Sequence, residues 1–255
     1  MKRVQSGTST SDLLFSSHQT NNQYLFPKIL DLYVEDGSKV ADLTYGKGVF
    51  WREVELDRYD TYFSDLQTGV DSRRTHYDDS CFDCVVFDPP YMEGLYRRTS
   101  NQMAGSSSHS AFRDRYSDSL PSIESGRKYH DRVLEMYIHT GVEVDRILKK
   151  GGIYIVKCQD EVSANRQKLT HIEIVYGMEQ IGFYCKDLFV ITRNNSPSVS
   201  RVLKQEHSRK NHSYFLVFQK IRNRYTNIKD DILDMIDEAK KVRTLPILSL
   251  EREAS

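Results

Sequence analysis

The feature that most constrains the fold of this chain is a short apolar run that stops at an acid and two prolines. Residues 85–87 (Val-Val-Phe) are followed by the tetrad Asp88-Pro89-Pro90-Tyr91. A short β-branched run bounded by turn residues predicts a buried strand, and proline cannot extend a sheet. Asp88 and Tyr91 are therefore expected on a stiff loop at the carboxyl end of a strand, where open α/β sheets bind ligands.

The side chains of the tetrad suit chemistry at the amino group of a nucleobase. An exocyclic amino group is a poor nucleophile because its lone pair is delocalised into the ring. A carboxylate and a backbone carbonyl can accept its two N–H bonds and so aim the lone pair at an electrophile. A tyrosine ring can stack on the flat base. The alternative is a strand-ending turn in which Asp88 caps the next turn.

The tetrad resembles the (Asp/Asn/Ser)-Pro-Pro-(Tyr/Phe/Trp) hallmark of the amino-group methyltransferases that use S-adenosylmethionine, and it matches in full. The resemblance covers about residues 18–220. It implies an α/β, Rossmann-like class I methyltransferase fold, with a seven-stranded, mostly parallel sheet in the order 3-2-1-4-5-7-6 and an antiparallel last strand. It also implies catalytic roles: Asp88 and the Pro89 carbonyl bind the amino hydrogens, Pro90 stiffens the loop, and Tyr91 stacks on the base.

A second motif lies upstream, where a predicted strand runs into Asp42 and then into a Gly-x-Gly turn and a predicted helix. Glycine permits positive φ and close approach of backbone to a ligand. The spacing resembles the cofactor loop of the same family, which implies that Asp42, Tyr45, Gly46 and Gly48 bind S-adenosylmethionine. The three-glycine dinucleotide pattern is absent, which argues against NAD.

Two further residues are candidates for cofactor binding. The strand predicted over 61–64 ends at Asp65, which is 23 residues after Asp42 and so near the spacing of a ribose-binding acid. The alternative for Asp65 is a helix cap. Phe26 belongs to Phe26-Pro27-Lys28, which resembles a degenerate form of a family element that packs on the methionine end of the cofactor. A Pro-started amphipathic helix that covers the sheet is an equally good interpretation.

Helices and strands alternate downstream of the tetrad. Apolar periodicity predicts helices over 130–148 and 164–181, and strands are predicted over 153–157, 187–192 and 209–218. This alternation predicts one α/β domain with a mostly parallel sheet.

The domain boundaries follow from the same patterns. We expect a flexible N-terminal tail over 1–16, a catalytic domain over 17–222, and a C-terminal helix and tail over 223–255. The segment 92–129 lacks clear periodicity, and long segments of this kind are usually functional or disordered. Its place after the tetrad predicts a loop that closes over the substrate.

Basic residues in two segments are candidates for contacts to nucleic-acid phosphates. The alternative is that both segments are simply solvated. The candidates are Arg97, Arg98, Arg113 and Arg115 in the 92–129 segment, and Arg209 and Lys210 at the start of the last predicted strand.

Charge balance and apolar composition limit the partners and the location that we expect. Lys plus Arg and Asp plus Glu both number 36, so no global field recruits nucleic acid. No stretch approaches the roughly 20 apolar residues of a membrane span, and the N-terminus lacks an apolar signal core, so we expect a cytoplasmic protein. Cys81-x-x-Cys84 lies on a predicted strand, where residues three apart face opposite sides, and we expect no metal.

The function predicted from these features is site-specific methylation of adenine N6 in DNA, because in the family an acidic first tetrad residue favours adenine. We expect it to be the methyltransferase of a restriction–modification system, an orphan methyltransferase or a phage enzyme. The alternatives are an RNA base methyltransferase acting on adenine N6 or guanine N2, an N4-cytosine DNA methyltransferase, and a non-catalytic methyltransferase-fold subunit. The spacing between the motifs leaves no room for a separate recognition domain. Either the 92–129 loop and the basic hairpin read a short site, or a homodimer or a specificity partner supplies recognition.

Overall fold

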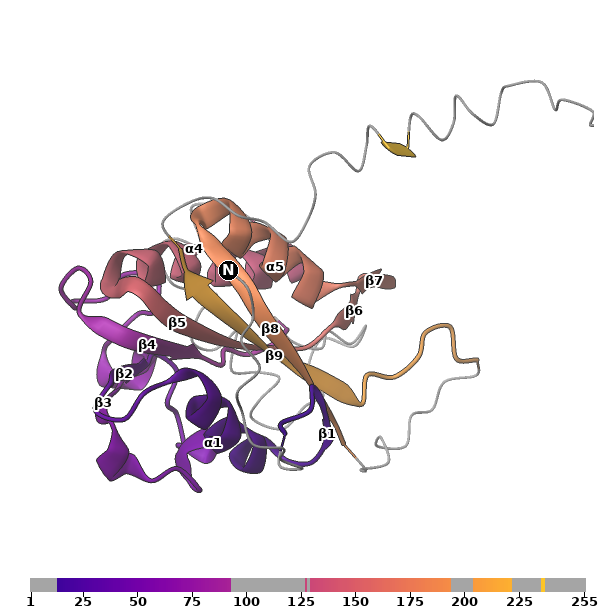
Figure 1. The fold of residues 1–255 in the computed structure, drawn as a ribbon. Helices are drawn as coiled ribbons and strands as arrows, with labels where there is room; N and C mark the ends of the chain where they lie inside the picture. The colour runs from indigo at the N-terminus through magenta and orange to yellow at the C-terminus, as the bar shows by residue number, and fades with distance from the viewer. Residues whose placement is uncertain (1–12, 93–126, 128, 194–203, 222–234, 237–255) are drawn as a thin grey trace, which may run out of the picture.

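The structure is a computed structural model, and it describes residues 13–92, 127, 129–193, 204–221 and 235–236. Within these residues, a seven-stranded sheet forms the middle layer, with helices on both of its faces (Figure 1). The sheet order is β1-β8-β9-β5-β4-β2-β3. Its strands are β1 (Ser17–Gln19), β2 (Lys39–Asp42), β3 (Asp60–Phe63), β4 (Phe82–Phe87), β5 (Leu148–Cys158), β8 (Phe183–Thr192) and β9 (His212–Lys220).

The helices and the remaining elements connect and cover these strands. The α-helices are α1 (Asn22–Tyr33), α4 (His130–Ile147) and α5 (Thr170–Ile181). Two 3-10 turns lie between β2 and β3, namely η1 (Val49–Trp51) and η2 (Leu56–Arg58), and a third, η3 (Leu66–Thr68), follows β3. A separate two-stranded hairpin consists of β6 (Glu161–Ser163) and β7 (Arg166–Lys168).

The directions of the strands confirm the predicted fold class. β2 pairs in parallel with β3 and β4, β4 pairs in parallel with β5, and β1 pairs in parallel with β8. β9 is antiparallel to both of its neighbours, β5 and β8. The result is a Rossmann-like sheet of the class I methyltransferase type, with an antiparallel last strand.

One edge of the sheet differs from the implied strand order. The run β3-β2-β4-β5-β9-β8 follows the expected 2-1-4-5-7-6, but no described strand lies beyond β3. The seventh strand is β1 at the opposite edge, where His18 pairs with Ile191 of β8. The implied order was therefore wrong at this position. Pairing with β1 satisfies the backbone groups that an edge strand would leave open.

Two local predictions were wrong. The turn after the glycine loop is one 3-10 turn, η1, and not a helix. The helix expected to begin near 164 begins at Thr170, because the β6–β7 hairpin occupies the preceding residues. The two turn residues of the hairpin, Ala164 and Asn165, have φ of 49° and 60°. Two successive positive φ values make the tight reversal that a two-residue hairpin requires.

One further helix prediction was wrong in its start, and another cannot be compared with the described residues. α1 begins at Asn22, and Pro27 lies inside it, so α1 is not a Pro-started helix. The C-terminal helix expected within 223–255 lies outside the described residues, apart from residues 235–236.

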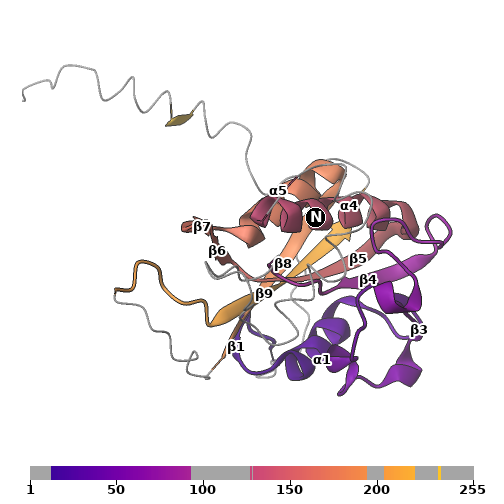
Figure 2. The ribbon, with the colours of Figure 1, turned by 180° about the vertical axis from the view of Figure 1, so that it is seen from behind.

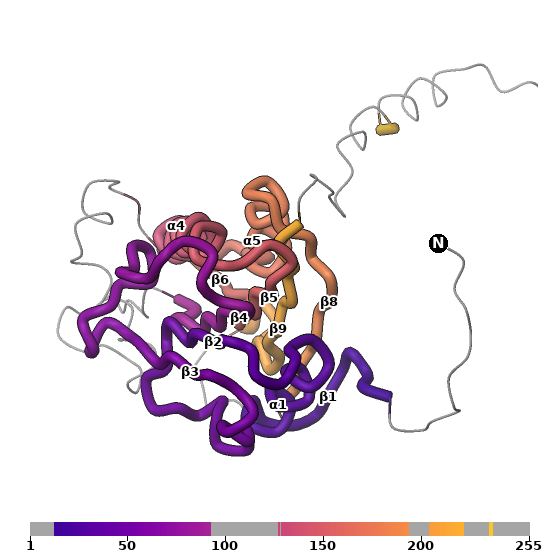
Figure 3. The backbone as a smooth tube through the Cα atoms, turned by 60° about the vertical axis from the view of Figure 1, so that its left-hand side comes forward, coloured from indigo at the N-terminus to yellow at the C-terminus, as the bar shows by residue number. Residues whose placement is uncertain are grey.

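The two faces of the sheet carry separate parts of the core. α4 and α5 lie together on one face, and α1 lies on the other (Figures 2 and 3). Strand side chains alternate between the faces. Phe87 therefore packs in the α4/α5 cluster, whereas its neighbour Val86 packs with Phe26 and Trp51 in the α1 cluster.

Candidate active site

The ends of three parallel strands bring acidic and basic side chains together at the carboxyl edge of the sheet. Asp42 is the last residue of β2, Asp88 is the first residue after β4, and Lys157 is the penultimate residue of β5. The register pairs Asp42 with Val86 and Phe87 with Val156. Alternation along the strands then places all three side chains on the α1 face.

Thr44 connects the glycine loop to the tetrad. Its hydroxyl accepts a hydrogen bond from the backbone N–H of Asp88 at 2.6 Å and donates one to Oδ1 of Asp42 at 3.2 Å. The backbone N–H of Thr44 also donates to Asp42 Oδ1, at 2.8 Å. One side chain thus fixes the two motifs relative to each other. Thr44 was not among the residues predicted from the sequence, where its only local signal is a hydroxyl two positions after a strand-end acid.

Asp42 is a buried carboxyl that is surrounded by donors. It is 4% exposed, and the indole Nε1–H of Trp51 donates to Oδ2 at 2.7 Å. Burial raises the pKa of Asp42 to about 7, because the hydrogen bonds from Trp51 and Thr44 do not offset the loss of water, and the charge of Asp88 adds to the rise.

The glycine loop has a conformation that requires glycine. Gly46 and Gly48 have φ of +53° and +61°, which other residues rarely adopt. A Cβ on Gly48 would also lie 2.5 Å from the hydroxyl oxygen of Tyr45. The Tyr45 ring is held in place because it stacks on Phe63, with ring centroids 4.2 Å apart.

Asp65 supports the glycine loop from the adjacent strand end. Its Oδ2 accepts a hydrogen bond from the backbone N–H of Gly46 at 3.1 Å. Its Oδ1 accepts from the N–H groups of Gln67 and Thr68, at 2.7 Å and 3.0 Å, so that Asp65 caps η3. The carboxylate therefore has a structural role as a cap, and its role at a ribose stays a prediction.

The tetrad holds its own carboxylate in place. The Tyr91 hydroxyl donates a hydrogen bond to Oδ1 of Asp88 at 2.7 Å. Burial raises the pKa of Asp88 to about 6, although this hydrogen bond and the positive charges of Lys157 and Arg193 act to lower it. Pro89 is buried, and Tyr91 is half-buried. Asp88 is therefore ionised at neutral pH.

Residues from both motifs line one cavity of about 160 Å³. The lining residues are Asp42, Thr44, Tyr45, Gly46, Lys47, Val49, Phe50 and Asp88. The structure therefore brings the tetrad carboxylate to the predicted cofactor loop. Phe26 does not line the cavity: it is fully buried, and its ring packs on Phe50, Trp51 and Phe215.

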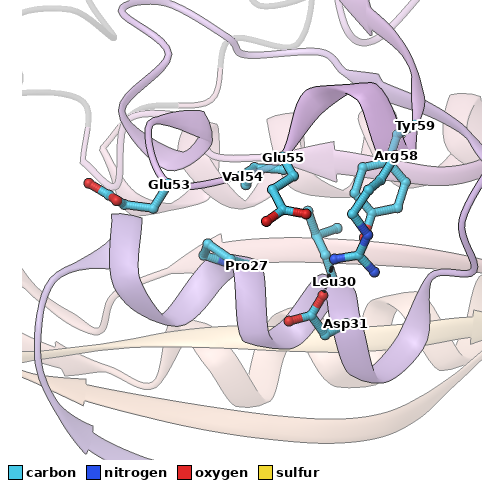
Figure 4. A pocket seen from close by; sticks show the side chains of 8 residues that line it. All are labelled: Pro27, Leu30, Asp31, Glu53, Val54, Glu55, Arg58 and Tyr59. Atoms are coloured by element: carbon cyan, nitrogen blue, oxygen red, sulfur yellow. Dashed lines mark hydrogen bonds and ion pairs between the residues drawn. The ribbon is translucent and has the colours of Figure 1, made fainter.

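A second hollow lies on the outer side of α1 and contains none of the predicted site residues (Figure 4). Pro27, Leu30 and Asp31 of α1 face Glu53, Glu55 and Arg58 across it. Its one basic side chain, Arg58, forms ion pairs with Asp31 and Asp36. The residues that line this hollow belong to neither the tetrad nor the glycine loop.

The predicted phosphate-binding residues are placed only in part. Arg97, Arg98, Arg113 and Arg115 lie outside the described residues. Arg209 and Lys210 immediately precede β9, which begins at the same edge of the sheet as the cavity. The amide of Gln159, which follows β5, donates to the Lys210 carbonyl at 3.3 Å.

The described residues contain neither a candidate metal site nor a candidate membrane-spanning helix. Within the described ranges, no group of three or more His, Cys, Asp or Glu side chains is arranged to hold a metal ion. No helix in the same part of the chain has the length and apolar character needed to cross a membrane.

Comparison with protein families gives the chain its family. The model of a DNA methylase family matches residues 82–247, which is more than half of the chain. The chain belongs to this DNA methylase family. The match begins at β4 and includes the tetrad, whereas the glycine loop precedes the matched residues. No curated protein matches the chain.

Solved structures resemble this chain at low sequence identity. A candidate DNA modification methylase from Thermus thermophilus is 16% identical, with a TM-score of 0.36, and the match covers 69% of this chain and 58% of that one. The same protein complexed with S-adenosyl-L-methionine gives a TM-score of 0.35, at 16% identity and coverages of 69% and 61%. A SAM-dependent methyltransferase from Methanosarcina mazei is 11% identical, with a TM-score of 0.42 and coverages of 76% and 98%. The chain thus spans less than two thirds of the Thermus protein.

Proposed function

We propose that this DNA methylase transfers a methyl group from S-adenosylmethionine to the exocyclic N6 of adenine in DNA. One observation carries the proposal: Asp88 of the tetrad and Asp42 and Gly46 of the glycine loop line the same cavity. Thr44 holds the two motifs together through short hydrogen bonds. A group that binds amino hydrogens therefore lies beside a loop suited to a cofactor.

The residues of the cavity fit S-adenosylmethionine. Gly46 and Gly48 let the backbone approach a ligand closely, and the Tyr45 ring offers an apolar surface. Carboxylates suit the positive sulfonium, and Asp42 and Asp88 both line the cavity. Asp65 orders the loop by binding the Gly46 N–H, and Phe26 supports the Phe50 wall from the core. When bound, the cofactor supplies an electrophilic methyl group.

The tetrad residues bind and orient the target base in this proposal. The base is rotated out of its stack, as enzymes that modify bases require. The Asp88 carboxylate and the Pro89 carbonyl accept the two amino hydrogens, and Tyr91 stacks on the base. The pKa of about 6 leaves Asp88 ionised at pH 7–8, which is the state that accepts these hydrogen bonds. Arg209 and Lys210, together with the basic residues of the 92–129 segment, hold phosphates.

The choice of adenine N6 rests on the acid in the first position of the tetrad. The test incubates the purified full chain with tritiated S-adenosylmethionine and with duplex DNA, the same DNA as single strands, or total RNA. Mass spectrometry of the digested nucleosides then names the polymer and the methylated atom. N6-methyldeoxyadenosine is the expected product.

The other outcomes distinguish the alternatives. N4-methyldeoxycytidine would overturn the choice of base, and methylated adenosine or guanosine from RNA alone would overturn the choice of polymer. Saturable cofactor binding without any labelled product would indicate a non-catalytic subunit. Light scattering of the chain with and without DNA tests the predicted homodimer, and activity that appears only after addition of another subunit would reveal a specificity partner.

A further inference from the structure

Lys157 is a lysine with no exposed surface, at the carboxyl end of β5. Lysine is almost never fully buried unless it is paired. The register pairs Phe87 of β4 with Val156 of β5, so that Lys157 lies level with Asp88. Adjacent strands are about 4.8 Å apart. The buried ammonium therefore belongs to the same site as the tetrad carboxylate.

The next strand holds the Lys157 side chain in one orientation. Lys157 pairs with Phe215 of β9, and its Nζ lies 4.6 Å from the centroid of the Phe215 ring. Nζ also donates a hydrogen bond to Oγ of Ser213 at 2.5 Å. No carboxylate of the described residues lies within 4.0 Å of Nζ as an ion-pair partner. The ammonium is thus fixed near Asp88 without a direct ion pair.

The charged and titratable groups around Lys157 come from three elements. Asp88 follows β4, Cys158 is the next residue of β5, and Arg193 follows β8. Burial lowers the pKa of Lys157 to about 8, while the negative charge of Asp88 opposes this change and Arg193 contributes to it. Lys157 in turn lowers the pKa of Asp88 against the effect of burial. Both groups are therefore charged together at about pH 6–8.

We propose that Lys157 is a positioning residue, whose fixed ammonium keeps Asp88 ionised and oriented for the amino group of the base. This inference rests on the proposed function. Asp42 and Asp88 line one cavity and repel each other, and a bound base would remove more water from Asp88. Without a nearby cation, Asp88 would take up a proton and could no longer accept both amino hydrogens.

The first test compares Lys157→Met with Lys157→Arg. Methionine keeps an unbranched chain without charge, and replacing a buried ion by an apolar residue of similar volume is often tolerated. We expect kcat of Lys157→Met to fall about twofold at pH 7 and about tenfold near pH 5, because a rise of about one unit in the Asp88 pKa lowers the ionised fraction of Asp88 by about these factors. The KM for S-adenosylmethionine should stay nearly unchanged. The acid limb of the pH profile should move up by about one unit, and the basic limb near pH 8 should disappear. Lys157→Arg should restore part of kcat.

The second test needs no methylation, so it distinguishes failure of this inference from failure of the proposed function. A ¹³C NMR titration of the aspartate carboxyls, with Asp88→Asn identifying the Asp88 signal, measures the Asp88 pKa directly. We expect a higher Asp88 pKa in Lys157→Met and a smaller rise of the Asp88 pKa in Ser213→Ala. The milder Ser213→Ala variant replaces Lys157→Met in this test if the methionine variant does not fold. An unchanged Asp88 pKa in both variants would overturn the proposal, as would an unchanged pH profile.

Discussion

Two groups of polar side chains with little exposure lie on opposite faces of the same sheet edge, and they are held in opposite ways. On the α1 face, Asp42 and Lys157 are buried and Asp88 is half-buried, and none of the three forms an ion pair with another described residue. On the α4/α5 face, His130 and His171 contact carboxylates. The Nδ1 of His130 lies 2.8 Å from Glu161 and its Nε2 lies 2.5 Å from Glu173, while Nδ1 of His171 lies 2.7 Å from Asp160.

The pKa shifts show what this difference means for stability. Burial disfavours the charged form of His130, but the hydrogen bonds with Glu161 and Glu173 outweigh it and raise its pKa. In the same way, contact with His171 outweighs burial and lowers the pKa of Asp160. Both shifts favour the folded state. The pKa values of about 7 for Asp42 and about 6 for Asp88 are shifts that disfavour it at neutral pH.

We infer that the paired group of His130 and His171 serves the fold, and that the unpaired group of Asp42, Asp88 and Lys157 serves chemistry. Strongly perturbed ionisable groups in a cavity are candidates for function, and functional sites are commonly kept at some expense of stability. Four experiments test this inference.

The largest effect is expected for Asp88→Asn. The amide presents an N–H where the amino group of the base needs an acceptor, so we expect methylation to fall at least about 100-fold. Cofactor affinity should fall much less, because Asp88 is one of two carboxylates that line the cavity. Tritium transfer to DNA and cofactor titration measure the two. The matched control is Asp83→Asn on the same strand, because Asp83 pairs with Lys149 at the other end of β4. Wild-type activity in Asp88→Asn would contradict the proposal that the Asp88 carboxylate binds the amino group of the base.

On the paired face, His130→Gln should lower the free energy of unfolding by about 2–4 kcal/mol, because it leaves the buried Glu161 without its cation. Urea denaturation measures the change. The folded-state pKa of His130 is raised, so its contribution is fully present below the unfolded pKa of about 6.5 and is lost as pH rises through the folded value. The deficit should therefore be larger at pH 6 than at pH 9. The double variant His130→Gln/Glu161→Gln should recover part of it.

The same measurement on Asp88→Asn should give the opposite sign. The folded-state pKa of about 6 exceeds the unfolded value of about 3.9, so the folded protein holds the proton and loses stability as pH rises through this window. Asparagine removes that loss, and its Oδ1 can still accept from Tyr91. We expect a gain of about 1–2 kcal/mol at pH 8 that vanishes near pH 4. A variant less stable than wild type at pH 8 would contradict the assignment of the unpaired group.

The smallest effect is expected in the glycine loop. Gly48→Ala should weaken S-adenosylmethionine binding about 5- to 10-fold, because positive φ disfavours alanine and the new Cβ would displace Tyr45. Gly37 is the matched control, since it has φ of +80° but no atom within 4 Å of the place that a Cβ would take. Equal binding by the two alanine variants would show that the Tyr45 contact has no role in cofactor binding.

Local pattern was sufficient for much of the fold. The β-branched run before the tetrad predicted β4, apolar periodicity predicted α4, and the alternation of elements predicted a parallel sheet with its site at the carboxyl edge. Turn chemistry was predicted less well. The positive φ of Ala164 and Asn165 creates the β6–β7 hairpin within a segment whose apolar periodicity predicts a helix.

Local sequence specifies which chemical groups lie at strand ends, because strand periodicity and the rigidity of proline act over a few residues. The way in which those groups come into contact depends on the tertiary fold. Thr44 binds the backbone of a residue 44 positions away, Lys157 binds Ser213 across the sheet, and β1 joins the far edge beside β8. No local pattern encodes such contacts, since each depends on strand order and register, which the packing of the whole chain selects.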